Sequence, residues 1–105
     1  MRNGMKNPNR MLSQDEVTKR LQEHPDVFKL AKRVGRWVWI EFGTIPPVDI
    51  RMWLLDLGFW WNAKREVWQH PCGHPSKASP DDPRWKYGSF PLMDAVMNAS
   101  EEEIA

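Results

Sequence analysis

Residues 36–73 constrain the fold of this chain more than any other part, because three local patterns follow one another there. The first is an alternation over residues 36–42, which has the period of two that a strand requires. One side of this alternation carries Val38, Ile40 and Phe42, and the other carries Trp37, Trp39 and Glu41. The pattern predicts a strand over residues 36–42.

The second pattern predicts a helix over residues 48–57. Pro46 and Pro47 end the strand region, and Pro47 fits a first helical turn, where a missing N–H costs little. Gly58 is placed to end the helix in the left-handed conformation. The helix has two apolar sets, Ile50, Trp53, Leu54 and Leu57 in one and Val48, Met52 and Leu55 in the other. A helix that is apolar nearly all round is either buried within the monomer or part of a subunit interface, and both alternatives stay open.

The third pattern predicts an antiparallel hairpin. Residues 59–62 and 67–70 flank the polar tetrad of residues 63–66, which places Trp61 opposite Trp68. In that register one face carries Phe59, Trp61, Trp68 and His70, and the other carries Trp60, Asn62, Val67 and Gln69. The first face has the larger apolar set, so we expect it to join the core and to leave Trp60 at least partly exposed.

Two helices are expected before this unit. Ser13 followed by Glu16 is an N-cap signature for a helix to about Glu23. After Pro25, an apolar stripe with helical spacing predicts a second helix that Gly35 ends. The stripe consists of Val27, Leu30, Ala31 and Val34, and a basic row of Lys29, Lys32, Arg33 and Arg36 falls on the opposite face.

The rest of the chain is expected to be less regular. Residues 1–11 read as a flexible tail, residues 74–83 as a long loop, and residues 99–105 as an acidic tail. Residues 84–87, if extended, would place two aromatic rings opposite two cations. A short helix over residues 91–97 would close the fold, with Met93, Val96 and Met97 pointing inward.

The sequence therefore predicts one α+β domain over residues 12–98. It comprises two N-terminal helices, a β-α-β-β unit with the helix packed on a small sheet containing antiparallel strands, and an irregular C-terminal third with a short helix. The expected core consists of Val17, Leu21, Val27, Leu30, Val34, Val38, Ile40, Phe42, Ile50, Trp53, Leu54, Leu57, Phe59, Trp61 and Trp68.

Composition narrows the class of protein. The chain has 105 residues, seven tryptophans and one cysteine, so it fits a single tryptophan-rich domain without an internal disulfide. Neither a signal peptide nor a membrane span is indicated, and we expect a cytoplasmic protein. The net charge of +1 hides a basic N-terminal third and an acidic C-terminal end. It is too close to zero to argue for nonspecific nucleic-acid binding by charge alone.

One cluster has the residue types of a metal or thiol site, His70-x-Cys72-x-His74. Zinc ligands are usually separated by two or more residues within a pair and need a fourth ligand, so an ordinary turn is the preferred interpretation. No glycine-rich phosphate loop or G-x-S-x-G motif occurs in the sequence. We therefore expect a protein without catalytic activity, cofactor or metal.

Aromatic and basic residues alternate at three places along the chain. Single-stranded nucleic acid is bound by this combination, because bases stack on aromatic rings while cations follow the phosphates. Protein interfaces also enrich Trp, Tyr and Arg, so a protein partner is the alternative. The candidate contact residues are Lys32, Arg33, Arg36, Trp37, Trp39, Trp60, Lys64, Arg65, Arg84, Trp85, Lys86 and Tyr87.

Residues 57–73, preceded by residues 37–42, resemble a small family of uncharacterised proteins from phages, plasmids and integrated elements. Members carry a Gly-Phe-x-Trp-Asn segment, a second Trp and a His-Pro-Cys-Gly end, which here are residues 58–62, Trp68 and residues 70–73. The resemblance implies a mobile-element origin and brings no activity or catalytic residue. Trp60 stands where such a hairpin is expected to have a polar or basic residue, which implies an added contact surface.

Two functions from different classes follow. The first is a non-catalytic accessory protein of a phage or mobile element that binds nucleic acid, single-stranded by preference. The second is a protein that inhibits a host defence nuclease, in the manner of an anti-CRISPR or anti-restriction protein, with exposed tryptophans as anchors. A homodimer is compatible with either function.

Overall fold

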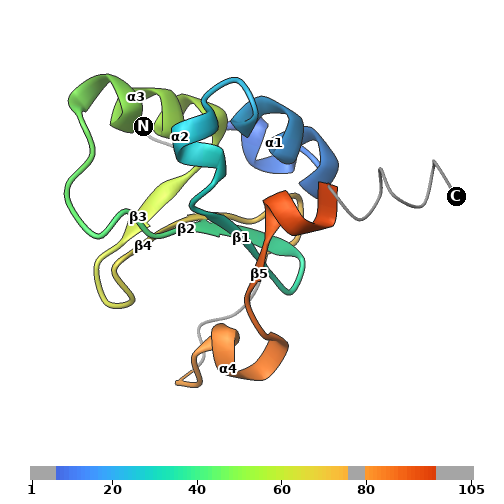
Figure 1. The fold of residues 1–105 in the computed structure, drawn as a ribbon. Coiled ribbons are helices and arrows are strands. Elements are labelled where there is room, and N and C mark those ends of the chain that lie inside the picture. Colours follow the sequence, from blue (N-terminus) through green and yellow to red (C-terminus); the bar gives the residue numbers. More distant parts are fainter. Residues whose placement is uncertain (1–6, 76–79, 97–105) are drawn as a thin grey trace, which may run out of the picture.

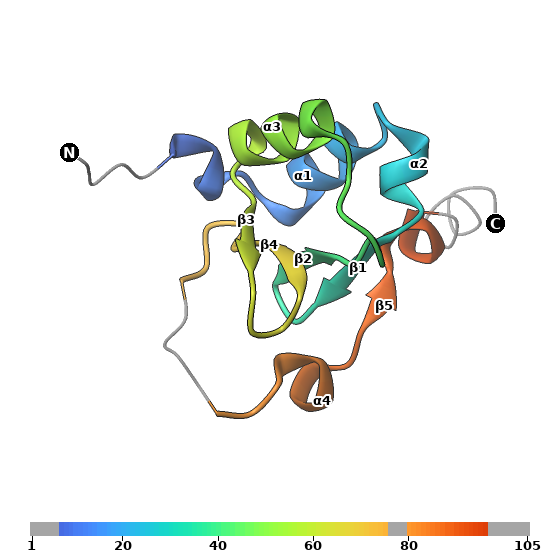
Figure 2. The same cartoon turned by 90° about the vertical axis from the view of Figure 1, so that its left-hand side faces the viewer.

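The computed structural model describes residues 7–75 and 80–96, and it has the α+β architecture that the sequence predicts. Three helices cover one face of a five-stranded antiparallel sheet, and a fourth lies on the opposite side (Figures 1 and 2). The elements are the 3₁₀ helix η1 (Pro8–Met11), α1 (Gln14–Leu21), α2 (Pro25–Phe28), β1 (Ala31–Val34), β2 (Trp37–Ile40), α3 (Val48–Leu57), β3 (Trp60–Asn62), β4 (Val67–His70), α4 (Pro83–Tyr87) and β5 (Phe90–Pro91), followed by helical residues 92–96.

The strand, helix and hairpin predicted from residues 36–73 are confirmed. The helix α3 begins and ends at the predicted residues, and Gly58 follows it in the left-handed conformation with φ of 107°. In the hairpin, Trp61 pairs with Trp68 as expected. The Ser13 side chain also caps α1 by accepting a hydrogen bond from the Glu16 N–H, at 3.1 Å. These features are local, so neighbouring residues are sufficient to specify them.

The second predicted helix is wrong beyond Phe28. Residues 31–34 form β1, which pairs with β2 through a tight turn at residues 35 and 36, and β5 pairs with the other edge of β1. The strand order is β3-β4-β2-β1-β5. Ala31 and Val34 are both buried, as a helical stripe also predicts, but here they lie on opposite faces of the sheet. The predicted basic row therefore does not exist as one helical face.

The main core lies between the sheet and α1, α2 and α3. Its buried residues include Val17, Leu21, Val27, Phe28, Ala31, Val38, Ile40, Leu54, Leu57, Phe59, Trp68, Cys72 and Leu92. Four predicted core residues, Leu30, Phe42, Ile50 and Trp53, pack against this cluster while partly buried. Val34, also predicted, belongs to the smaller cluster on the other face. Two expectations are wrong: Trp61, on the edge strand, is 48% exposed, and Met93 is also exposed.

The opposite face of the sheet carries the smaller cluster of Val34, Trp39 and Val67, with Trp37 packed against it. Residues 84–87 contribute to covering this face, and they form part of α4 rather than an extended segment. Pro83 at the first turn and the Asp82 side chain, which accepts from the Arg84 N–H at 2.9 Å, start this helix. The sheet is thus covered on both faces over part of its width.

Residues 7–11, expected in a flexible tail, are held against the end of α3. The Asn7 side chain donates to the carbonyl oxygens of Leu55 and Asp56, at 3.0 and 2.9 Å. These carbonyls belong to the last turn of α3, where the regular hydrogen-bond pattern of the helix ends, and the Leu55 oxygen also accepts from the Gly58 N–H at 3.1 Å. The other tail residues 1–6 and 99–105, and the predicted inward position of Met97, lie outside the described residues. None of the helices in the described ranges has the length and apolar content that a membrane crossing needs.

Candidate functional site

The structure divides the twelve candidate contact residues among separate places. Six of them lie around β1, β5 and α4, and Phe90 of β5 joins them although the sequence pattern does not single it out. We call this surface the basic-aromatic edge, and it consists of Lys32, Arg33, Arg36, Trp85, Lys86, Tyr87 and Phe90. Figure 2 shows β5 beside β1, with α4 below the sheet on the side away from α1, α2 and α3.

Backbone geometry brings the edge together. Gly35 has φ of +60°, and a side chain there would meet the Tyr87 ring at 3.3 Å, so Tyr87 packs directly on the β1–β2 turn. Phe90 pairs with Arg33 across the β1–β5 ladder. The Arg33 guanidinium lies 5.5 Å from the centre of the Phe90 ring, and the Lys86 ammonium lies 5.3 Å from that of Tyr87. Cations and aromatic rings are therefore adjacent.

The exposure and charge of this edge suit a contact surface. Trp85 is 91% exposed, and Tyr87 and Phe90 are also exposed. Among the described residues, none of the cations Lys32, Arg33, Arg36 and Lys86 forms an ion pair with a carboxylate. Cations without such partners are available to an external anion.

Trp37 and Trp60 form a second aromatic group on the face of the sheet opposite α3. Their rings meet edge to face with centres 5.4 Å apart, and the Arg10 guanidinium lies 4.7 Å from the centre of the Trp60 ring. Both tryptophans are half-buried, so the expected partial exposure of Trp60 is confirmed. Arg10 was missed because only the fold of residues 7–11 brings it here. Lys64 is exposed in the β3–β4 turn, apart from both groups.

Three candidate residues are instead engaged inside the structure. Trp39 is buried, so it does not offer a ring face to a partner, and the Arg84 guanidinium lies 5.1 Å from its ring centre. Arg84 pairs with Glu41 at 2.6 Å and with Asp82 at 2.8 Å, and Arg65 lies 3.5 Å from Asp82. The hydrogen bond from Arg84 lowers the pKa of Asp82 to about 2. Trp39, Arg65 and Arg84 therefore hold α4 against the sheet, which removes them from the contact surface.

His70 and Cys72 are buried and take part in hydrogen bonds that hold the fold together. The Cys72 N–H donates to His70 Nδ1 at 2.9 Å, and Nε2 lies 2.9 and 3.0 Å from the carbonyl oxygens of Asn9 and Leu57. Burial raises the pKa of the Cys72 thiol to about 12, so the thiolate needed of a nucleophile is strongly disfavoured. His74 is exposed. Within residues 7–75 and 80–96 no cluster of three His, Cys, Asp or Glu could hold a metal ion.

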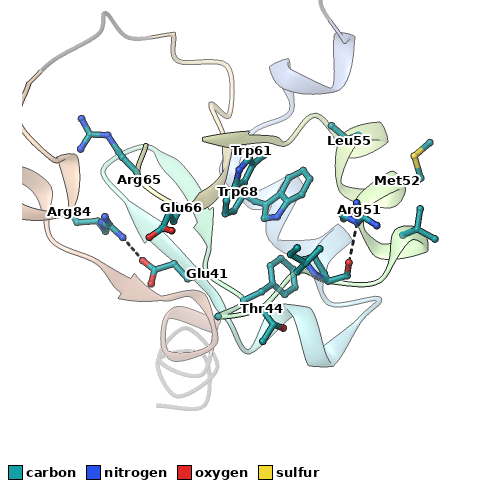
Figure 3. Close-up of a pocket in the computed structure, with 15 residues that line it drawn as sticks. Glu41, Thr44, Arg51, Met52, Leu55, Trp61, Arg65, Glu66, Trp68 and Arg84 are labelled. Atoms are coloured by element: carbon teal, nitrogen blue, oxygen red, sulfur yellow. Dashed lines mark hydrogen bonds and ion pairs between the residues drawn. The ribbon is translucent and has the colours of Figure 1, made fainter. Parts of the chain in front are cut away.

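An open groove of about 870 Å³ separates the outer side of α3 from the hairpin and the loop of residues 41–46. Arg51, Met52 and Leu55 on α3 lie on one side, and Trp61 and Trp68 lie on the other (Figure 3). Arg51 donates through Nε to the Pro46 carbonyl oxygen at 3.1 Å, which ties this loop to the helix. The groove was not predicted, although its apolar α3 residues belong to the second apolar set recognised in the sequence.

Comparison with protein-family models, with curated proteins and with solved structures finds no match for this chain.

Proposed function

We propose that this protein binds single-stranded nucleic acid, without catalysis, through the basic-aromatic edge. The observation that carries the proposal is that exposed Tyr87 and Phe90 lie beside Lys86 and Arg33, which have no carboxylate partner in the described residues. Exposed Trp85 precedes Lys86 in the same helix, α4. A base of any identity stacks on an aromatic ring, at about 1–3 kcal/mol per base, while cations follow the phosphates. An edge that combines exposed aromatic rings with cations therefore suits a ligand that carries both bases and phosphates.

The cation–ring pairs explain why such an edge would favour a single strand. Arg33 beside Phe90 and Lys86 beside Tyr87 each place a positive charge next to a ring. A stacked base then has its own phosphate close to a cation, whereas the paired bases of a duplex are not available for stacking on side chains. We further propose an accessory role in a phage or mobile element, supported by the resemblance of residues 57–73 to proteins of such elements.

The test is a titration of fluorescently labelled oligothymidine and oligouridine, followed by anisotropy at about 50 and 200 mM salt. We expect both to bind, with affinity falling as salt rises. Trp85→Ala should weaken binding at both salt concentrations. Lys86→Glu should weaken it and also reduce the salt dependence, because one phosphate contact is lost.

Two exposed residues outside the edge provide matched controls for this titration. Trp61→Ala removes a half-exposed tryptophan from β3, at the opposite edge of the sheet, and Lys19→Glu reverses an exposed charge on α1. Both variants should bind like the wild type. If all four variants bind alike, or if the wild type shows no salt-dependent binding, the proposal is wrong.

A protein partner at the same edge is the second candidate, because the exposed ring of Trp85 suits a protein interface as well as it suits a base. Trp, Tyr and Arg are the residues that most often anchor protein interfaces, and an inhibitor of a host defence nuclease would use them in this way. Capture of partners from host lysate, with and without nuclease treatment, separates the two candidates. A partner retained after nuclease treatment and lost with Trp85→Ala would favour protein binding.

A further inference from the structure

The helix α3 has an inner apolar face that the core buries and an outer apolar face that the described residues leave exposed. Leu54 and Leu57 are buried against the sheet, whereas Val48, Met52 and Leu55 are between 45% and 63% exposed. Rotation of about 100° per residue places these three outer side chains within about 60° of one another. The outer face is therefore apolar and exposed, as a subunit interface requires. Such an interface is one of the two alternatives that the sequence left open for this helix.

The spacing of the outer face is that of a coiled-coil seam. Val48, Met52 and Leu55 follow one another at intervals of four and three residues, which are the d, a and d positions of a heptad. Arg51 then falls at a g position on one flank, and Asp49 and Asp56 fall at e positions on the other. Residues at these flanking positions set the partner and the orientation of paired helices through interhelical ion pairs.

The flanking charges distinguish a parallel pair from an antiparallel one. In a parallel pair, g residues of one helix face e residues of the other, so Arg51 meets Asp56 of the second copy. In an antiparallel pair, Arg51 would face Arg51 of the second copy, and the aspartates would face each other. Across the described residues, neither Arg51 nor Asp56 forms an ion pair within its own chain.

We propose that α3 pairs in parallel with α3 of a second copy of this chain, so that the protein forms a symmetric dimer. Ile45 and Trp61, which line the adjoining groove and are exposed, extend the apolar surface beyond the helix. Five side chains of this size and exposure present on the order of 500 Å². A stable interface buries about 800 Å² per partner, so the dimer requires the polar residues around this apolar surface to be buried as well. The dimer leaves the basic-aromatic edge free and does not depend on nucleic-acid binding.

The first test is the oligomeric state of the purified full chain, measured by sedimentation velocity from about 1 to 500 μM. This range covers dissociation constants that differ by about 500-fold, or about 3.7 kcal/mol in free energy of association. We expect a reversible dimer within it. Met52→Glu places a charge in the centre of the seam and should give a monomer at every concentration. Met93→Glu makes the same substitution at an exposed methionine outside α3 and should leave the dimer intact. Circular dichroism confirms that each variant is folded.

The second test fixes the orientation. Arg51→Glu and Asp56→Arg should each weaken the dimer at least tenfold, and the double variant should restore it. Val48→Cys should form a disulfide between two copies, because position 48 faces itself only in a parallel pair. A wild type that stays monomeric at 500 μM, a dimer that survives Met52→Glu, or failure of both the rescue and the cross-link would overturn the proposal.

Discussion

The ring of His70 links the N-terminal segment to the sheet, with Nε2 2.9 Å from the carbonyl oxygen of Asn9. The same nitrogen lies 3.0 Å from the carbonyl oxygen of Leu57, and Nδ1 accepts from the Cys72 N–H. Because Nδ1 is an acceptor, Nε2 carries the proton and the ring is neutral. One buried side chain therefore holds together η1, the end of α3, β4 and the turn that follows it.

The protonation of His70 predicts a pH dependence of stability. Burial lowers the pKa of His70 below 6.5, because it disfavours the charged ring. As pH falls through 6.5 the unfolded chain takes up a proton that the folded chain does not, so the folded state loses stability. The stability that the neutral His70 ring contributes is fully present above about pH 6.5. Below that pH it falls by up to about 1.4 kcal/mol per pH unit, until the pH reaches the pKa of His70 in the folded protein.

Urea unfolding between pH 7 and 5 measures this effect, with His70→Gln as the comparison. The Asp82 carboxyl, whose pKa is about 2, contributes only at lower pH, so it does not interfere in this window. His70→Gln should be less stable at pH 7 and should show a smaller loss of stability on acidification. An equal loss in both proteins would assign the pH dependence to other groups.

Substitution of Gly58 should be far more costly than that of another glycine with positive φ. Gly58 has φ of 107°, and a Cβ there would lie 2.8 Å from His70 Nε2 and 2.9 Å from the Arg10 backbone nitrogen. Gly43 has φ of 78°, and a Cβ at that position would meet nothing within 4 Å. Gly43→Ala should cost about 1 kcal/mol from backbone strain alone, and Gly58→Ala more than about 2 kcal/mol. Chemical denaturation of both variants checks this, and equal losses would mean that the His70 contacts relax freely.

Substitution of Phe59 and substitution of Trp61, two aromatic residues of the same hairpin, should differ sharply in their effect on stability. Phe59 is fully buried, whereas Trp61 lies on the edge strand beside the groove, with its ring centre 5.8 Å from that of Trp68. Phe59→Ala should cost about 3–5 kcal/mol, and Trp61→Ala less than about 1 kcal/mol. Thermal unfolding at low protein concentration, where association does not contribute, measures both. A large loss for Trp61→Ala would show that Trp61 belongs to the core after all.

The thiol of Cys72 should be unreactive while the protein is folded. Burial raises its pKa to about 12, and the residue lies in the turn that His70 holds through the Cys72 N–H. A disulfide reagent at pH 8 should react at least ~100-fold more slowly with native protein than with protein in denaturant, because the thiolate is the reacting form. Cys72→Ala gives the baseline. Rapid reaction of the native chain would show that residues 71–73 open without global unfolding.

The sequence alone determined the elements whose signals are local. Pro47 and Gly58 correctly mark the two ends of α3, and Ser13 caps α1. The polar tetrad of residues 63–66 sets Trp61 opposite Trp68. In each case a few adjacent residues restrict the backbone, so no distant contact is needed. The charges and rings of the basic-aromatic edge were also selected from the sequence, except Phe90.

Contacts between distant parts of the chain selected one of two local patterns and determined which faces became covered. Ala31 and Val34 fit a helical stripe and a strand equally well, and pairing with β2 on one side and β5 on the other selected the strand. Alternation placed Phe59 and Trp61 on one face, but α3 covers only the first of them. The edge strand β3 has a neighbour on one side alone, which leaves Trp61 beside an open groove. Burial depends on what packs against a residue, and that partner is distant in the sequence.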